Sequence, residues 1–456
     1  MAQVVAQSPS KFEEAILESN DQQRTVDITP SIVSFDYYED IFSPTITATL
    51  KMINTGDSIP SANPDGSTDK NPQSVYNGLP LRGGERLRLK ISPNTESNIA
   101  IDFSKSSKDY LYVSSITDVI AESQREAFTL HLTSREAITN ETVRVGKKFA
   151  PDNSIDTSVK QILKNILKTD KFTNDSIERT TNKYGFIGNM RKPFTVLIWL
   201  ASKGVPATSG DATAGFVFYQ TKDGFNFRSI DNLIKQKPKA VYLYSQSIET
   251  YDEKGDAVKN DFKILKYTTE KNQNLIEKLK LGTYSSYRIF FNPLTFEFTN
   301  PQKGLFKLND YVNKTSNLGE KIKLPKITSG SSKDLGETPT RIFTMCLDVG
   351  TLNKEPSKEV NASPEKYQSQ SIMRYNILFT QTLSMVVPLN TNLSAGDVIK
   401  CNFPKISSQD GNELDEETSG LYMIKELCHH FDTESSYTSM KLVRDTFGIN
   451  PEANKS

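Results

Sequence analysis

The sequence predicts a β-rich α+β protein with two similar antiparallel β-barrel domains, a small helical insertion and additional β elements. Three observations support this prediction. Thr, Ser, Asn, Tyr and Phe are abundant, which favours twisted antiparallel strands over helical bundles. Most of the chain has apolar side chains in period two, and a helical period is concentrated in residues 151–206. Four sequence landmarks also occur twice in the same order, as expected of a duplicated domain.

Composition excludes several classes of protein. The chain has 456 residues, enough for two to four domains. Its 55 basic residues balance 55 acidic ones, so no net charge draws it to nucleic acid or to an anionic membrane. Any contact with DNA must therefore be local or indirect. Cys346, Cys401 and Cys428 form no CxxC pair or disulfide framework, so we expect reduced, buried thiols.

The start of the chain has no basic segment followed by an apolar one, and no run of about 18 apolar residues occurs. We therefore expect synthesis in the cytoplasm and no insertion into a membrane.

A short N-terminal helix is predicted before the first barrel. Ser10 and Glu13 have the spacing of a capping box, and Phe12, Ala15 and Ile16 continue an amphipathic pattern. The period then changes to two, and turn-rich residues 57–79 interrupt it as a long loop. Strands of the first barrel are expected near residues 26–35, 46–50, 85–91, 110–120 and 127–134.

A helical insertion and a β-hairpin follow. Asp156 can cap one helix, and Pro193 at a first-turn position opens another. Asp223-Gly224 is a strong signal for a hairpin between strands near 215–220 and 225–229. Strands dominate afterwards, and the polar segments 327–339 and 353–369 are predicted to be exposed loops.

These patterns divide the chain into six parts. The predicted parts are an N-terminal helix or leader (1–24), a first barrel (25–145), a helical insertion with a hairpin (146–240), a second barrel (241–300 and 370–448), an inserted loop-rich segment (301–369) and a tail (449–456).

The duplication is the most informative pattern in the sequence. Each landmark in the first barrel has a counterpart of similar spacing later in the chain. The pairs are Tyr38, Phe42 and Pro44 with Tyr287, Phe291 and Pro293; Gly84-Glu85 with Gly396-Asp397; Tyr110-Leu111-Tyr112 with Gly420-Leu421-Tyr422; and Phe128-Thr129 before Arg135-Glu136 with Tyr437-Thr438 before Arg444-Asp445.

Two similar domains in one chain suggest a way of matching symmetries. A ring of three such chains presents six nearly equivalent barrels, which could sit on a true hexamer. Exposed strand edges could also continue a sheet from one subunit to the next, which protects them from aggregation.

Three blocks of sequence resemble the central hub protein of the baseplate in T-even-like contractile-tailed phages. Within that group, they are similar to the sequences of the cyanophage branch. The resemblance spans most of the chain, although residues 57–80 and 300–365 contribute nothing to it. The blocks are Asp36-Tyr37-Tyr38-Glu39-Asp40-Ile41-Phe42-Ser43-Pro44, Asp223 to Asp231, and Tyr375 to Asp445 with Ala395-Gly396-Asp397-Val398-Ile399 and Ser419-Gly420-Leu421-Tyr422.

The resemblance implies a homotrimer in the baseplate of the virion tail. Two tube-like barrels per chain would form a pseudo-hexameric ring that adapts the hexameric tail tube to the trimeric central spike. Its partners would be the tail tube protein, the central spike protein and baseplate wedge proteins, and DNA would pass transiently through the channel that the ring lines. The sequence shows no needle-like repeats and no lysozyme-like domain, so spike and wall-cleaving functions are expected in another protein.

The repeated aromatic-proline turns are the candidate subunit or partner interface. We expect exposed strand edges there, with obligate interfaces on the order of 2,000 Å² or more. The candidate residues are Tyr38, Phe42, Pro44, Tyr287, Phe291 and Pro293.

No catalytic, cofactor-binding or metal-binding residue is assigned. Cys428-His429-His430 invites a metal interpretation, with Cys401 on a neighbouring strand, but adjacent strand residues point to opposite faces. A core cysteine beside two partly exposed histidines is favoured instead. The acidic cluster in 413–417 lacks the ligand spacing of a calcium loop and is better explained as a solvated hairpin tip.

Two other classes of function stay open. A cell-wall-degrading enzyme could hide a pair of carboxylates among the 55 acidic residues, although no motif selects a pair. A receptor-binding module would need a terminal β domain with an exposed aromatic patch. The duplicated barrel argues against the second class, because such a module has no use for pseudo-hexameric matching.

Overall fold

The computed structural model describes residues 8–55, 74–79, 81–122, 124–207, 213–245, 260–293, 295–298, 304–312, 316–347, 364–405 and 414–449. Most of the predicted loop 57–79 and nearly all of the predicted tail 449–456 lie outside these ranges. No helix in the described part of the chain has both the length and the apolar character needed to cross a membrane.

Strands make up most of the regular structure. The strands are β1 (Lys11–Glu18), β2 (Thr25–Asp27), β3 (Ile32–Asp40), β4 (Thr47–Thr55), β5 (Arg86–Ser92), β6 (Ile101–Asp102), β7 (Leu111–Ala121), β8 (Arg125–Ser134), β9 (Lys148–Phe149), β10 (Phe186–Ile187), β11 (Phe216–Thr221), β12 (Gly224–Ser229), β13 (Val241–Leu243), β14 (Lys266–Asn272), β15 (Ser285–Asn292), β16 (Glu297–Phe298), β17 (Leu305–Lys307), β18 (Arg341–Cys346), β19 (Gln381–Pro388), β20 (Val398–Asn402), β21 (Gly420–Asp432) and β22 (Ser436–Arg444).

Helices lie mainly at the periphery of the sheets. They are α1 (Val75–Gly78), α2 (Arg135–Thr142), α3 (Ile155–Asn165), α4 (Pro193–Ala201), α5 (Ile230–Ile234), α6 (Leu275–Leu281) and α8 (Pro364–Leu378), with 3-10 turns η2 (Thr29–Ser31), η3 (Asn260–Phe262) and η4 (Leu308–Asp310).

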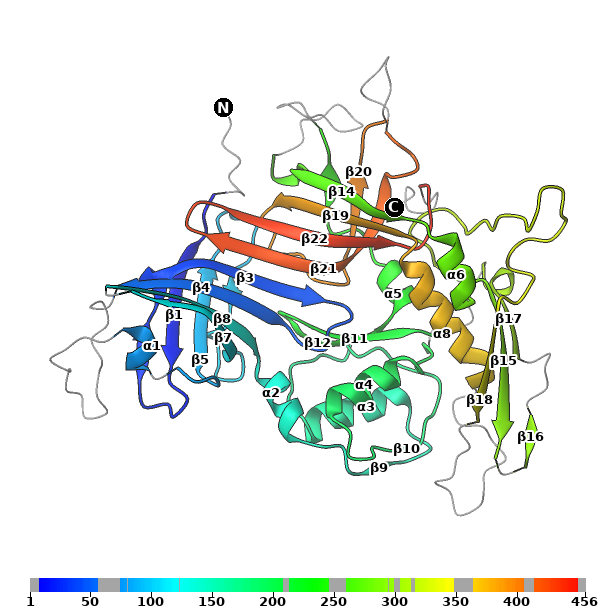
Figure 1. Ribbon diagram of the computed structural model, residues 1–456, viewed down its shortest axis with the longest axis horizontal. Helices are drawn as coiled ribbons and strands as arrows, with labels where there is room; N and C mark the ends of the chain where they lie inside the picture. Colours follow the sequence, from blue (N-terminus) through cyan, green and yellow to red (C-terminus); the bar gives the residue numbers. More distant parts are fainter. Residues whose placement is uncertain are drawn as a thin grey trace.

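One 14-stranded sheet dominates the molecule. Its main path runs β14-β19-β22-β21-β3-β4-β8-β7-β5-β1-β2, with β20 and β13 attached beside β21 and β6 attached to β5. Figure 1 shows β19, β22, β21, β3 and β4 side by side across the centre, although β21 and β3 are far apart in the sequence. The predicted β-rich fold class is therefore confirmed.

The sheet consists of two halves with the same internal order. The first half runs β3-β4-β8-β7-β5-β1, and the second runs β14-β19-β22-β21-β20-β13, so equivalent strands also follow the same order along the chain. One difference is that β1 pairs with β5 in antiparallel fashion whereas β13 pairs with β20 in parallel. Each half covers its own apolar core, one containing Phe35 and Leu130 and the other Met385 and Met440.

Local details confirm the duplication. Gly84 and Gly396 both have a φ near +90°, a conformation that favours glycine, and each precedes the equivalent strand β5 or β20. The register of β7 shifts between Val113 and Ser115, and that of β21 shifts between Ile424 and Glu426. These β-bulges occupy equivalent places, which fixes Leu132 of β8 and Leu442 of β22 as equivalent residues.

The expected N-terminal helix is wrong, because Lys11–Glu18 forms β1 and pairs with β5 along its length. Ala15 and Leu17 are buried while Ile16 between them is less so, which is period two. The capping-box spacing of Ser10 and Glu13 was coincidental. Pairing to a preformed sheet edge outweighed a weak local helical preference.

The helical insertion and the hairpin are confirmed. α3 and α4 pack with the hairpin β11–β12 around one apolar core that contains Leu163, Leu197 and Phe218. In Figure 1 these helices lie below the hairpin, outside the large sheet.

The placement of Tyr287, Phe291 and Pro293 in the second barrel is wrong. β15 belongs to a separate four-stranded sheet with β16, β17 and β18, which lies beside α8 at the right of Figure 1. The strand equivalent to β3 is β14, which comes earlier in the chain. Aromatic-proline spacing recurs easily in strand-rich sequence and does not fix which sheet a strand joins.

Gly396 offers a test of how tightly the turn into β20 is packed. A Cβ added there would lie 2.4 Å from the hydroxyl of Tyr219, whereas Gly330, at φ +86°, has nothing within 4 Å. We expect both Gly→Ala substitutions to add backbone strain of about 1–2 kcal/mol, and Gly396→Ala to lose about 1–3 kcal/mol more through overpacking. Urea denaturation of the two variants measures the difference; equal losses would contradict the packing described here.

Candidate assembly surfaces

The first predicted interface triplet lies at the end of β3 and in the following turn. Tyr38 is 39% exposed and shares a groove on the outer face of the sheet with Cys428. Phe42 packs on Phe379 with ring centroids 5.6 Å apart, so part of it is covered within the chain. Pro44 is partly buried. Phe42 is nevertheless 38% exposed, so both Tyr38 and Phe42 are partly open to the outside.

The second predicted triplet lies on the peripheral four-stranded sheet. Tyr287 and Phe291 are half-buried, and Pro293 is exposed. Phe291 contacts Phe296 and Phe298 with centroids 6.1 and 5.3 Å apart. The structure therefore places the two triplets on different sheets, and a role for either in assembly stays a prediction.

The large sheet has one apolar face and one polar face that both continue across its halves. On β21, Leu427 and Phe431 enter the cores of the second and first halves respectively, while Cys428 and His430 between them point the other way. We call this outer side the polar face. It includes Asp36, Tyr38, Asp40, Thr47, Lys51, Ser384, Glu426, Cys428, His430, Tyr437, Ser439 and Lys441.

Most charged groups on the polar face are paired with one another. Lys441 lies 3.2 Å from Glu426, and Lys425 lies 3.2 Å from Asp40. His430 hydrogen-bonds Asp36 through Nδ1 and lies 3.0 Å from Asp432 through Nε2. The bond with Asp36 is the main cause that raises the pKa of His430. The face is therefore polar without a strong excess of either charge.

The Cys428-His429-His430 segment shows why a metal site is disfavoured. His429 is fully buried and hydrogen-bonds Thr438 at 3.0 Å, whereas His430 lies on the polar face. Burial raises the pKa of the Cys428 thiol to about 12 and lowers that of His429 to about 3. Among the residues that the structure describes, no group of three or more His, Cys, Asp and Glu side chains is arranged to hold a metal ion.

A buried carboxylate fastens the halves together. Glu39 accepts hydrogen bonds from the Tyr37 hydroxyl at 2.9 Å, the Lys222 backbone N–H at 2.7 Å and the Ala395 backbone N–H at 2.8 Å. These donors belong to β3, the β11–β12 turn and the segment before β20. Burial raises the pKa of Glu39. The first half, the hairpin and the second half therefore meet at one side chain.

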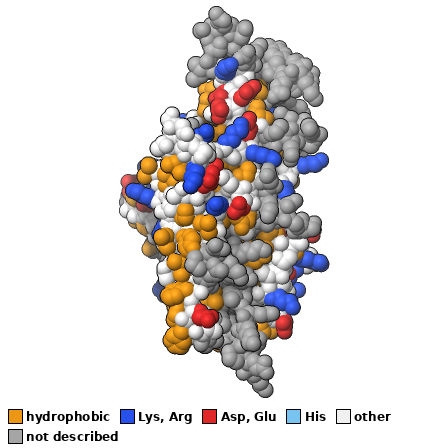
Figure 2. Space-filling model, turned by 90° about the vertical axis from the view of Figure 1, so that its right-hand side faces the viewer, with side chains coloured by type: hydrophobic (Ala, Val, Ile, Leu, Met, Phe, Trp, Pro, Cys, Tyr) orange, Lys and Arg blue, Asp and Glu red, His pale blue; other side chains and the backbone are white. Residues whose placement is uncertain are grey.

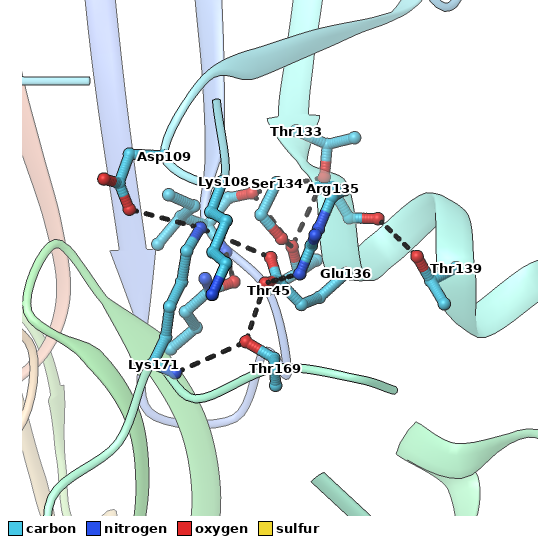
Figure 3. Close-up of polar contacts among 12 residues, drawn as sticks. Thr45, Lys108, Asp109, Thr133, Ser134, Arg135, Glu136, Thr139, Thr169 and Lys171 are labelled. Atoms are coloured by element: carbon cyan, nitrogen blue, oxygen red, sulfur yellow. Dashed lines mark hydrogen bonds and ion pairs between the residues drawn. The ribbon is translucent and has the colours of Figure 1, made fainter. Parts of the chain in front are cut away.

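A second buried carboxylate attaches the helical insertion to the first half. Glu136 is fully buried at the start of α2; it accepts a hydrogen bond from the Thr169 hydroxyl at 2.8 Å and lies 3.5 Å from the Lys171 ammonium. Arg135 lies 3.3 Å from the same carboxylate (Figure 3). Thr169 and Lys171 come from the segment after α3, so their contacts with Glu136 fix the helices against the end of β8.

Apart from the short end strands, two strands of the large sheet, β14 and β7, have an edge that is free over much of its length within the described residues. β14 pairs on one side with β19 and has no strand partner among the described residues on the other. β7 pairs with β8 along one edge, but its other edge meets β5 and the residues just before β5 only from Leu111 to Val113. The remainder of β7 is exposed, with Ile120 at 60%. Sequence reasoning missed both edges, because strand order cannot be deduced from local periodicity.

Several exposed apolar side chains lie on the peripheral sheet and α6. Figure 2 shows apolar side chains gathered in the lower part of this side of the molecule. The most exposed members are Phe296 at 79%, Ile342 at 68%, Phe298 at 62% and Ile276 at 60%. Exposed apolar side chains that gather on one side of a protein often mark interaction surfaces.

Comparison with known proteins supports a tail protein. No family model matches the chain. A protein of Vibrio phage KVP40, named a probable baseplate hub protein (gp334), is 20% identical over 297 residues, which cover 64% of this chain and 66% of that protein. The chain thus matches slightly less than two thirds of that relative's length.

Two solved structures show the same fold. One is the 43 kDa tail protein of prophage MuSo2 from Shewanella oneidensis, with a TM-score of 0.50, 9% identity and coverage of 95% of this chain and 98% of that one. The other is the tail protein from Neisseria meningitidis MC58, with a TM-score of 0.50, 8% identity and coverage of 95% and 97%. The chain is therefore similar in sequence to a phage baseplate hub protein and shares the fold of phage tail proteins.

Proposed function

We propose that this chain is a structural subunit of the baseplate hub in a contractile phage tail, and that three copies form a ring joining the tail tube to the central spike. The observation that carries the proposal is the junction between β3 and β21, which joins two equivalent halves edge to edge in one sheet. A chain that already contains one such junction needs only to repeat it between copies to build a ring of six halves.

Such a ring could connect a structure with sixfold symmetry to one with threefold symmetry. Six similar halves can meet a hexameric tube on one side, while three identical chains can meet a trimeric spike on the other. The curated relative is named as a hub protein, which supports this location in the virion. The tail tube protein, the central spike protein and the wedge proteins are the partners that the proposal requires.

The polar face is the part of the chain that we assign to the channel. It is continuous across β4, β3, β21, β22 and β19, and its carboxylates pair with Lys425 and Lys441 and hydrogen-bond to His430. A strongly basic wall would hold DNA by contacts with its phosphates. Paired charges and hydroxyl groups instead allow DNA to pass without being retained.

A structural role also fits the buried ionisable groups. Glu39, Glu136 and His429 lie inside the protein and hydrogen-bond to neighbouring segments, so they tie parts of the fold together. The similar proteins are tail and baseplate proteins. We therefore propose that the chain is not an enzyme and needs no cofactor.

Light scattering tests the proposal. The purified protein is measured alone and after addition of the tail tube and central spike proteins of the same phage. We expect either a particle of three times the 51.1 kDa chain mass or, once the spike is present, a complex whose mass corresponds to three such chains plus the spike. A protein that stays monomeric with both partners would contradict the hub assignment and restore the receptor-binding and enzymatic alternatives.

A further inference from the structure

The internal junction supplies a template for contacts between copies. One edge of β21 pairs with β22 from Met423 to Phe431; the other pairs first with β20 and then, from Glu426 to Asp432, with β3. At the centre of this junction His430 lies opposite Asp36, and the two side chains are hydrogen-bonded on the polar face.

The free edges are the equivalents of the two edges used in that junction. β7 is equivalent to β21, and beyond Val113 the edge that corresponds to the β3-binding edge has no strand partner within the described residues. β14 is equivalent to β3, and the edge that corresponds to the β21-binding edge is likewise free there. One chain therefore carries both strand edges that a second junction of this kind requires, one in each half of its sheet.

The register follows from the equivalent bulges. Leu132 and Leu442 are equivalent, so Ala127 of β8 corresponds to Tyr437 of β22, and their partners Ile120 and His430 correspond as well. β7 has a further register shift before Ile120 that β21 lacks, so the correspondence is taken through β8 and β22. On the other side, Leu130 and Met440 correspond, and they pair with Leu50 and Met385. Thr49 and Ser384, which precede Leu50 and Met385, are therefore equivalent. Thr49 pairs with Asp36 and Ser384 pairs with Thr268, so Asp36 and Thr268 are equivalent as well.

We infer that the exposed part of β7 pairs antiparallel with β14 of a second copy of this chain, with Ile120 opposite Thr268 of that copy. The inference rests on the proposed ring and specifies which edges close it. Each contact joins unlike edges, and such head-to-tail contacts form a closed ring when the rotation between copies permits.

The chemistry of the two edges suits this pairing. Continuing the antiparallel register places Glu122 beside β7 opposite Lys266 of β14, so opposite charges would face each other across the contact. Val119 and Ile120 are 45% and 60% exposed, unusual for apolar residues at a free sheet edge. Pairing would cover these side chains and satisfy the unpaired backbone groups of both strands.

A designed disulfide tests the inference. Ile120→Cys and Thr268→Cys are combined in a background in which the exposed Cys346 is replaced by serine. Directly opposed strand residues have Cα atoms about 4.5–5.5 Å apart, within the range that a disulfide bridges. Oxidation under the conditions that give the trimer should produce covalent dimers and trimers on a non-reducing gel.

Two matched pairs act as controls. Ile187→Cys with Thr268→Cys uses a similarly exposed residue, 49%, on the helical insertion, and should give no specific product. Ala121→Cys with Thr268→Cys shifts the register by one residue, which turns the thiols to opposite faces, and should cross-link much less.

The outcomes separate this inference from the hub proposal. Trimers in light scattering together with efficient Ile120–Thr268 cross-linking support both. Trimers in which this pair links no better than the controls overturn the assignment of edges and leave the hub proposal standing. A monomer in the presence of both partner proteins overturns both.

Discussion

Replacement of Arg374 by methionine is expected to lower the free energy of unfolding by about 3–5 kcal/mol, because it leaves buried carboxylates without their cation. Arg374 on α8 is 1% exposed; its guanidinium lies 2.8 Å from Asp231 and 3.5 Å from Asp445. Both carboxylates are themselves buried, and burial raises the pKa of Asp445. Methionine preserves most of the volume, so the loss reports mainly the uncompensated charge.

The measurement is chemical denaturation at neutral pH, with Lys323→Met as the control. Lys323 pairs with Glu320 at 3.0 Å, but both side chains are largely exposed, so this substitution should cost less than about 1 kcal/mol. If Arg374→Met is no more destabilising than the control, the buried ion pairs described here do not hold α8 to α5 and the end of β22.

Acidification from pH 8 to pH 5 is expected to remove about 2 kcal/mol of stability through His429 alone. Burial lowers the pKa of His429 to about 3 in the folded protein, whereas the unfolded chain titrates near the ordinary value of 6.5. Below pH 6.5 the unfolded state therefore binds a proton that the folded state does not, and stability falls as pH decreases.

Comparison with His429→Gln isolates this contribution. Glutamine keeps a polar group near Thr438 but does not titrate, so the variant should lose about 2 kcal/mol less than the wild type over the same pH range. His430 acts in the opposite direction, because its hydrogen bond with Asp36 raises its pKa and favours the folded state at low pH. It is present in both proteins and cancels in the comparison. An unchanged pH dependence in the variant would contradict the role of His429.

The sequence predicted the duplication better than it predicted which residues correspond. Gly84 and Gly396 could be recognised because a positive φ before a strand selects glycine in both halves. The predicted pairing of Phe128 with Tyr437 in the closing strands is wrong by one residue, because the register of the strands makes Phe128 equivalent to Thr438. Phe128 is buried in the core, whereas Tyr437 lies on the polar face. A shift of one residue reverses the face of a strand, and only the paired bulges reveal the true register.

The candidate surfaces were harder to predict than the fold. Tyr38 was identified and does face outward, but Tyr287 was assigned to the wrong sheet because its aromatic-proline pattern carries no information on long-range pairing. The polar face could not be assembled from single strands. His430 and Asp36 are 394 residues apart, and nothing local in either segment indicates that they meet.

That separation has a consequence for how the protein is made. β3 finds the partner for its second edge only in β21, so the edge has no strand to pair with until nearly the whole chain has left the ribosome. At a synthesis rate of about 5–20 residues per second, the interval is about 20–80 s. Throughout it the nascent first half carries an open edge that can pair with neighbouring nascent chains on the same polysome. The yield of native protein therefore depends on translation speed and on chaperones that occupy this edge until the carboxy-terminal strands arrive.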